Sequence, residues 1–258
     1  MQHQHAVAPT IELVDVYKSF GSKHVLYPAN IVIKPHRSTV IIGQSGTGKS
    51  VLIKLILGLL SPDYGQILIN GKNRARMAAK DLPRFGMLFQ GAALFDSLAV
   101  WENVAFGLIE GQGMKPAIAY EYALDALAQV GLPPEVAPLF PSELSGGMQK
   151  RVGLARAIAT NPDFLLFDEP TTGLDPIMSD VINNLIRSTV TKMGVTSLSI
   201  THDMASVRKI ADDVAMLHQG QIIWQGSLAE MEQSDNPYLQ QFINGRSEGP
   251  IRALQFRA

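Results

Sequence analysis

The stretch Thr39-Val40-Ile41-Ile42-Gly43-Gln44-Ser45-Gly46-Thr47-Gly48-Lys49-Ser50 decides how this chain folds. Its first four residues form a β-branched run without polar alternation, which is typical of a strand buried on both faces of a parallel sheet. The next eight match G-x-x-x-x-G-K-[ST], a loop that curls main-chain N–H groups around phosphate oxygens at the start of a helix. We therefore predict strand, phosphate-binding loop and helix, with Lys49 facing the β- and γ-phosphates and the Ser50 hydroxyl available to Mg²⁺.

Other apolar runs extend this pattern into an α/β core. Residues 164–167 and 195–200 read as buried strands, and each adjoins a helical stretch, which favours alternating β and α elements. Residues 10–17, 30–33 and 66–70 read as shorter strands, and the last closes at Asn70-Gly71, a dipeptide suited to the positive φ of a tight turn. We therefore predict an antiparallel β layer near the N-terminus.

The middle of the chain differs from this core. Apolar residues repeat at helical spacing over 117–127, and residues 100–108 and 148–159 are also predicted to be helices. We expect one domain over residues 1–258. Its core would comprise 1–90 and 161–236, with a helical insertion at 91–160 and a tail at 237–258 that docks on a neighbouring subunit or packs on its own chain.

Polar residues follow several apolar runs, at what would be one edge of the sheet. Asp168 and Glu169 end the run 164–167, where one carboxylate can face Mg²⁺ and the other a water molecule beside the γ-phosphate. His202 follows the run 195–200 and is predicted to contact the γ-phosphate. Gln90 follows a third apolar run, from which its amide could reach both the metal ion and the water. The sequence thus predicts metal-assisted phosphoryl chemistry.

Composition excludes several other classes of protein. The chain has 258 residues, 22 basic and 23 acidic side chains, a net charge of −1 and no cysteine. A disulfide framework is therefore excluded, and nucleic-acid binding through a basic face is not expected. The short basic stretch at 74–80 is interpreted as a solvated face. The apolar run at 51–60 is too short to cross a membrane, and residues 1–6 lack the features of a secretory signal.

The motif Leu144-Ser145-Gly146-Gly147-Met148 precedes the two carboxylates. With the phosphate-binding loop, Gln90, the carboxylate pair, Gly173-Leu174-Asp175 and His202, this order resembles the nucleotide-binding subunit of ABC transporters. The resemblance implies the ABC ATPase fold, a RecA-like P-loop NTPase core with an N-terminal antiparallel β layer and an inserted helical subdomain. It also implies hydrolysis of ATP with Mg²⁺.

The resemblance implies a role for each motif residue. Catalysis would involve Glu169, His202 and Gln90, and Mg²⁺ would be held by Ser50, Gln90 and Asp168. Tyr17 competes with Phe20 for the adenine-stacking role. The residues expected to bind the nucleotide are Phe20, Gly43, Gln44, Ser45, Gly46, Thr47, Gly48, Lys49, Ser50, Val51, Ser145, Gly146, Gly147, Met148 and Asp175.

The resemblance also implies partners. The family forms head-to-tail homodimers, in which one subunit's phosphate-binding loop and the other's signature motif hold one ATP. Met148, residues 94–104 and the C-terminal tail resemble the ATPases of Mla or Mce phospholipid transport systems. Expected partners are then a permease that contacts residues 90–101, an MCE-domain lipid-binding protein and a small regulatory subunit, with the ATPase on the cytoplasmic face of the inner membrane. The alternatives are a transporter for another small solute and a non-transport ABC ATPase.

Overall fold

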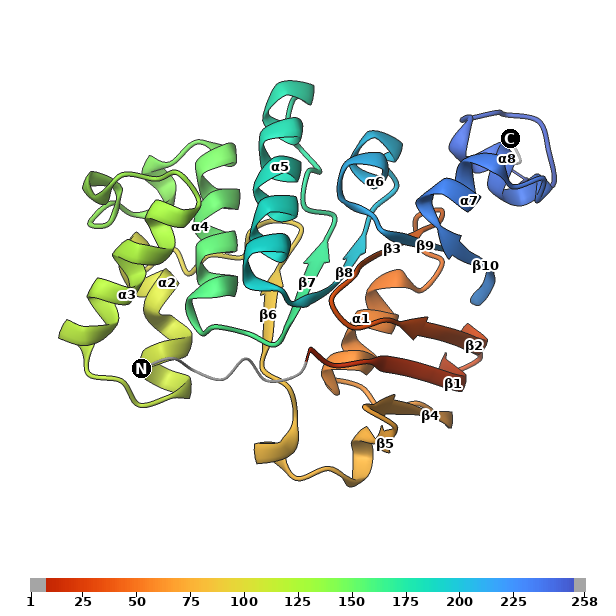
Figure 1. The fold of residues 1–258 in the computed structure, drawn as a ribbon, viewed down its shortest axis with the longest axis horizontal. Coiled ribbons are helices and arrows are strands. Elements are labelled where there is room, and N and C mark those ends of the chain that lie inside the picture. Colours follow the sequence, from red (N-terminus) through yellow and green to blue (C-terminus); the bar gives the residue numbers. More distant parts are fainter. Residues whose placement is uncertain (1–7, 253–258) are drawn as a thin grey trace.

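The computed structural model describes residues 8–252. Residues 1–7 and 253–258 lie outside the described part, and with them the N-terminal residues used above to judge the absence of a secretory signal. A six-stranded sheet, ordered β10-β9-β3-β8-β7-β6, forms the centre of the molecule (Figure 1). Its strands are β3 (Ser38–Ile42), β6 (Phe85–Leu88), β7 (Phe164–Asp168), β8 (Thr196–Ile200), β9 (Asp213–His218) and β10 (Gln221–Ser227).

All neighbouring strands of this sheet run parallel except β9 and β10. Every residue of β3 is buried, as its unbroken β-branched run predicts. In β7 and β8, Asp168 lies opposite Ile200. This register brings Glu169 and His202, the residues just beyond the two strands, to the same edge of the sheet.

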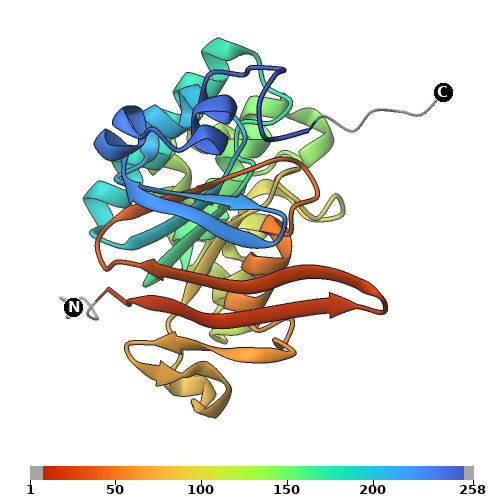
Figure 2. The same ribbon diagram turned by 90° about the vertical axis from the view of Figure 1, so that its right-hand side faces the viewer.

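A second, antiparallel sheet has the order β2-β1-β4-β5. Figure 2 shows its long β1–β2 hairpin beside the parallel sheet. Asn70 and Gly71 have φ values of 50° and 76°, so the predicted tight turn is confirmed, and it leads into a short strand that the prediction omitted. The strands are β1 (Ile11–Phe20), β2 (Lys23–Ile33), β4 (Tyr64–Ile69) and β5 (Lys72–Asn73).

Two apolar cores cover the opposite faces of the parallel sheet. Ile41, Leu166 and Leu198 face a core shared with α1 and the antiparallel sheet, whereas Ile42 and Phe167 face a core shared with α4, α5 and α6. The helices are α1 (Lys49–Leu57), α2 (Val100–Phe106), α3 (Pro116–Gln129), α4 (Gly146–Ala159), α5 (Pro176–Met193), α6 (Met204–Ile210), α7 (Leu228–Gln233) and α8 (Pro237–Ile243). The first helix after the phosphate-binding loop and the helix after the signature motif therefore lie on opposite faces.

The helices predicted in the middle of the chain are confirmed as α2, α3 and α4. The first differs from its prediction, because α2 ends at Phe106 and a π-helical turn, Gly107–Gly111, follows it. Strands β9 and β10 were not predicted, although Gln219 and Gly220 between them have φ values of 46° and 79° suited to a tight hairpin turn.

The described part of the tail packs on its own chain. Leu239 in α8 is fully buried in the core of the α4–α6 face, and Ile251 is also buried there. Gln241 connects the two, because its side chain exchanges hydrogen bonds of 2.7 and 2.9 Å with the main chain of Ile251. Residues 237–252 therefore pack on their own chain, and docking of the tail on a neighbouring subunit stays a prediction.

Candidate nucleotide-binding and catalytic site

The phosphate-binding loop connects β3 to α1. Gly43 has a φ of 153°, and a Cβ atom there would lie 2.2 Å from the carbonyl oxygen of Leu217 on β9, so only glycine fits this position. The loop ends at Gly48, the N-cap residue of α1, which leaves the first main-chain N–H groups of the helix without side-chain acceptors. These groups form the positive end of the helix toward which a phosphate would lie.

Lys49 is the first residue of α1 and is 93% buried. Its Nζ atom donates to the carbonyl oxygens of Gly43 and Gln44 at 2.7 and 2.8 Å. Burial lowers the pKa of the ammonium group, and the charges of Glu169 and Asp168 oppose that shift. The loop therefore holds a desolvated cation next to the place where phosphate would lie. Of the remaining predicted loop residues, Gly46 and Ser45 are exposed, whereas the Val51 side chain packs on the core.

Glu169 and His202 meet at the edge of the sheet. The Nδ1 atom of His202 lies 2.9 Å from Oε1 of Glu169, and the hydroxyl of Thr172 donates to the other carboxylate oxygen at 3.2 Å. Glu169 has a φ of 47°, which is uncommon for a non-glycine residue. In this conformation its main-chain N–H donates to the carbonyl oxygen of Ile200. The imidazole is half exposed and the carboxylate largely buried, so the pair faces solvent through His202.

The signature motif begins α4 on the other face of the sheet. Ser145 is the N-cap residue, and its Oγ accepts from the N–H of Met148 at 3.3 Å. Gly146 is exposed and lies near Leu174 of the loop that precedes α5. Asp175 uses its carboxylate to cap α5, accepting from two main-chain N–H groups at 2.9 and 3.0 Å. The loop at 173–175 and the signature motif are therefore neighbours within one chain.

The two aromatic candidates for adenine stacking differ in their surroundings. Tyr17 packs edge-on against Tyr64, with ring centroids 6.3 Å apart. Phe20, at the end of β1, is 47% exposed, and the ammonium of Lys18 lies 5.5 Å from its ring centroid. Phe20 therefore presents more free ring surface than Tyr17.

Comparisons with known proteins agree with this geometry. The ABC transporter family model matches residues 26–172, more than half of the chain. The chain belongs to the ABC transporter family. It is 44% identical to the protein TRIGALACTOSYLDIACYLGLYCEROL 3 of Arabidopsis thaliana, over 94% of this chain and 75% of the relative.

Two other relatives and a solved structure extend the comparison. The chain is 39% identical to the intermembrane phospholipid transport system ATP-binding protein MlaF of Haemophilus influenzae, over 94% of this chain and 93% of the relative. It is 38% identical to the probable ribonucleotide transport ATP-binding protein mkl of Mycobacterium bovis, over 94% and 68%. The structure of the ATP-binding cassette MJ0796, a dimer bound to ADP and Pi, has a TM-score of 0.75 and 30% identity over 84% of this chain and 98% of that chain. The predicted fold class and ATPase activity are thus confirmed.

The donor set of this ABC transporter ATPase fits Mg²⁺. The Ser50 side chain lies close enough to Asp168 to lower the pKa of its carboxyl group, so two hard oxygen donors lie near one another. Burial raises the pKa of Asp168, and the nearby Glu169 charge adds to the shift. A divalent cation would offset both effects. The predicted third ligand, Gln90, is exposed, and its side chain makes no hydrogen bond among residues 8–252.

Lys150 was not among the predicted site residues. It lies on the first turns of α4, is 95% buried, and its Nζ donates to the main-chain oxygen of Gln90. Burial lowers its pKa, and the charges of Asp168 and Glu169 oppose that shift, so its ammonium lies within electrostatic reach of both carboxylates. In the sequence, Lys150 is one of three polar residues that follow the signature motif, and only the packing of α4 beside β6 distinguishes it from the others.

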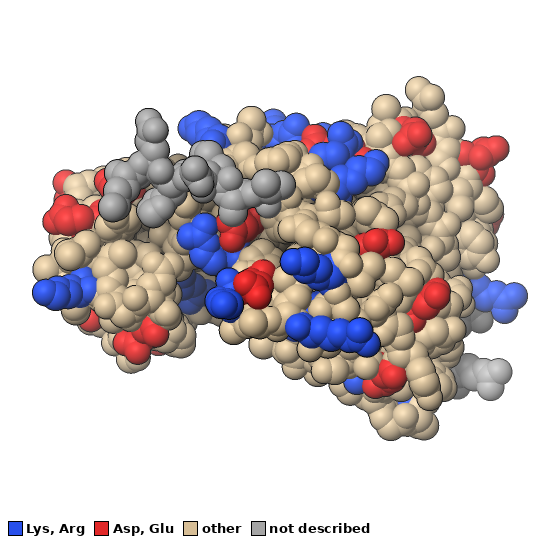
Figure 3. Space-filling model, turned by 60° about the horizontal axis from the view of Figure 1, so that its bottom comes forward, with Lys and Arg blue, Asp and Glu red and all other residues tan. Residues whose placement is uncertain are grey.

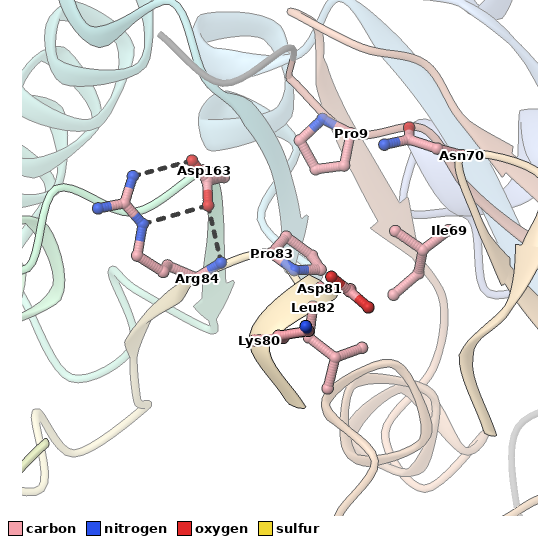
Figure 4. A pocket seen from close by; sticks show the side chains of 9 residues that line it. All are labelled: Pro9, Ile69, Asn70, Lys80, Asp81, Leu82, Pro83, Arg84 and Asp163. Carbon is pink, nitrogen blue, oxygen red and sulfur yellow. Dashed lines mark hydrogen bonds and ion pairs between the residues drawn. The ribbon is translucent and has the colours of Figure 1, made fainter. Parts of the chain in front are cut away.

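A separate pocket of about 330 Å³ lies at the opposite edge of the sheet, where β6 and β7 begin. Figure 4 shows Lys80 and Asp81 on its rim and the ion pair of Arg84 with Asp163 beside it. On this side of the molecule, Lys and Arg side chains are interspersed with Asp and Glu (Figure 3). The pocket is remote from the phosphate-binding loop, and the surface around it forms no continuous basic patch.

One residue of the basic stretch 74–80 has a structural role instead of the solvated position predicted for it. The Arg74 guanidinium donates to the carbonyl oxygens of Ile56 and Leu57 at the C-terminal end of α1. Cations at this end of a helix satisfy free carbonyl groups and complement the helix dipole. Arg74 therefore fixes the end of the helix that begins with the phosphate-binding loop.

Proposed function

We propose that this chain is the ATPase subunit of a transporter that moves phospholipid between membranes of a cell envelope. The observation that carries the cargo assignment is the match to MlaF, which spans nearly the full length of both chains. The name of the Arabidopsis relative also refers to a glycerolipid. The mkl name favours a second candidate, ribonucleotide cargo. A non-transport ATPase has no support among these relatives. No helix within residues 8–252 is long and apolar enough to span a membrane.

In the proposed catalytic cycle, two copies of the chain hold two nucleotides between them. The support is that α1 and α4 lie on opposite faces of the sheet, so one chain's loop and signature motif cannot surround the same phosphate. The MJ0796 neighbour is a dimer. Phe20 stacks on adenine, main-chain N–H groups over Gly43 to Val51 bind the phosphates, and the partner copy supplies Ser145 to Met148. Asp175 lies beside the signature motif at the dimer contact.

The proposed roles at the reacting phosphate follow from the side-chain geometry. Glu169 accepts a proton from the attacking water, and His202, hydrogen-bonded to Glu169, orients it and contacts the γ-phosphate. Lys49 binds the β- and γ-phosphate oxygens once it releases the loop carbonyls. Ser50, Asp168 and Gln90 hold Mg²⁺, which neutralises charge on the phosphates when bound.

The proposed membrane partner is a permease that contacts the surface around α2 and the loop before it. Phe95 and Phe106 are exposed there, with ring centroids 4.6 Å apart, and Phe89 is exposed just before Gln90. Trp101, also part of the predicted contact, packs edge-on against Tyr120 in the helical region, with ring centroids 5.3 Å apart. Further proposed partners are an MCE-domain lipid-binding protein and a small regulatory subunit, with the ATPase on the cytoplasmic face of the inner membrane.

Purification of the tagged chain with its membrane partners tests this proposal. We expect a multi-span permease and phospholipid in the complex, and ATPase turnover that rises with added phospholipid vesicles but not with cytidine monophosphate. Stimulation by the nucleotide alone would replace phospholipid with the second candidate. Lys49→Ala should abolish ATP binding, and Glu169→Gln should keep binding but lose turnover. Parental turnover in Glu169→Gln would refute the role of Glu169.

A further inference from the structure

A buried polar cluster lies beneath the catalytic edge, centred on the hydroxyl of Ser206. Ser206 is fully buried in α6, and its Oγ donates to Asp203 Oδ2 at 2.6 Å and accepts from Asn183 Nδ2 at 2.9 Å. The hydroxyl of Thr171 lies 3.2 Å from the same atom. A serine hydroxyl has one proton. Because the Ser206 proton is used in the hydrogen bond to Asp203, the hydroxyl of Thr171 must be the donor in its contact with Ser206.

These four residues come from three segments of the chain. Thr171 belongs to the loop after β7, two residues beyond Glu169, and Asp203 directly follows His202. Asn183 comes from α5, which packs beside α6 (Figure 1). Asp168 and Ile200 form the last residue pair of β7 and β8. Beyond this pair, the loops that follow the two strands are joined by two side-chain hydrogen bonds, one between Glu169 and His202 and one between Thr171 and Ser206.

Burial makes this cluster costly unless its geometry is kept. Thr171, Asn183 and Ser206 are all more than nine-tenths buried, and buried polar groups need their hydrogen-bond partners. The hydroxyl of Ser199 on β8 offers a contrast to that of Ser206, because it has no partner among residues 8–252, as is also true of the Oδ1 atom of Asn183. A fully buried serine with three partners therefore fixes the relative positions of three segments, whereas Ser199 fills space.

We propose that Ser206 is a positioning residue for ATP hydrolysis, whose hydroxyl holds the loop carrying Glu169 and the turn carrying His202 at the spacing of the catalytic pair. It acts through that pair and does not touch the nucleotide. The inference rests on the roles proposed above for Glu169 and His202.

Steady-state ATPase kinetics of the purified chain test the role of Ser206. Loss of a buried hydrogen-bond centre should lower kcat ~10-fold in Ser206→Ala, with the KM for ATP changed less than about twofold. Ser199→Ala removes an equally buried hydroxyl without partners and should retain parental kinetics. Thr171→Val, which removes only one arm of the cluster and keeps the side-chain volume, should lower kcat about threefold. It carries the test if Ser206→Ala does not fold.

A double-mutant cycle separates positioning from general destabilisation. In a His202→Ala background, Ser206→Ala should lower kcat less than about twofold further, because the pair it positions is already broken. Three results would overturn the inference. They are a tenfold loss of kcat from Ser206→Ala in the His202→Ala background, a tenfold rise in KM in Ser206→Ala itself, and parental kcat in both Ser206→Ala and Thr171→Val. Full turnover in Glu169→Gln would instead refute the catalytic role of Glu169, a separate outcome.

Discussion

Asn103, on α2, lies beneath the proposed permease surface, and its side chain makes several buried hydrogen bonds there. Its side chain is fully buried and bridges the preceding loop. Oδ1 accepts from the N–H of Phe95 at 2.7 Å, and Nδ2 lies 3.0 to 3.2 Å from the carbonyl oxygens of Phe95, Leu98 and Ala99. Replacement by alanine should therefore release residues 95–99 from α2.

The expected cost follows from these contacts. An amide NH₂ group has two protons, so the four contacts amount to three full hydrogen bonds, each with a net value of ~1 kcal/mol. Asn103→Ala should lower the free energy of unfolding by about 3 kcal/mol. The loss is smaller if the main-chain groups of Phe95 form hydrogen bonds with water in the variant. Asn103→Asp should cost more at neutral pH, because it loses both donors and buries a charge.

Urea unfolding followed by circular dichroism measures this cost. The matched control is Asn184→Ala, since Asn184 makes one exposed hydrogen bond, to Asp180 in α5, and its loss should change stability by less than about 0.5 kcal/mol. Asn103→Ala should retain ATP binding, because the phosphate-binding loop is untouched, but should lose stimulation of ATPase turnover by the membrane partner. A change in stability equal to that of the control would refute the assignment of Asn103 as the bridge.

Three further predictions follow from particular contacts. Burial raises the pKa of Asp168 above its ordinary value of 3.8. The contribution of this carboxyl group to the stability of the folded chain is therefore complete below pH 3.8 and is lost as pH rises through the raised pKa. Asp168→Asn should then resist urea better than the parent at pH 7, have the same stability as the parent in acid, and lose ATPase turnover. A Cβ at Gly86 would lie 2.1 Å from the carbonyl oxygen of Ala157, so Gly86→Ala should cost at least about 1–3 kcal/mol in the same unfolding assay. Gln241→Leu removes both hydrogen bonds to Ile251, and limited proteolysis should then cleave residues 244–252 faster than in the parent while ATPase turnover stays unchanged.

Sequence reasoning located the site where chemistry follows unbroken apolar runs. The runs before Gly43 and Asp168 have no polar alternation, so they predict buried parallel strands. The run before His202 contains Ser197 and Ser199 but is buried throughout as well, and the polar residues that follow the three strands meet at one edge. Strand β10 lacks that signal, because it lies at the edge of the sheet and its residues are partly exposed. Its pairing with β9 was therefore missed.

The residues that sequence reasoning missed depend on tertiary packing. Lys150 reaches the main chain of Gln90 from α4, which packs closely on β6 where Gly86 meets Ala157. Arg74 reaches the end of α1 from a segment that looks like a charged loop. Ser206 resembles any small residue on a helix until Thr171 approaches from another loop. Each of these contacts joins residues far apart in the chain, so no local sequence pattern predicts it.

The charges of the site are held at an electrostatic disadvantage until nucleotide binds. Burial lowers the pKa of Lys49 and raises that of Asp168, so each charged form is disfavoured in the folded chain. Phosphate oxygens would relieve the lysine, and a divalent cation would relieve the aspartate. Both costs are therefore offset together by a metal–nucleotide complex and only partly by the nucleotide alone. Because the costs are already present in the folded chain, they add to the difference in free energy between its empty and occupied states. That difference is what a conformational change driven by binding can use.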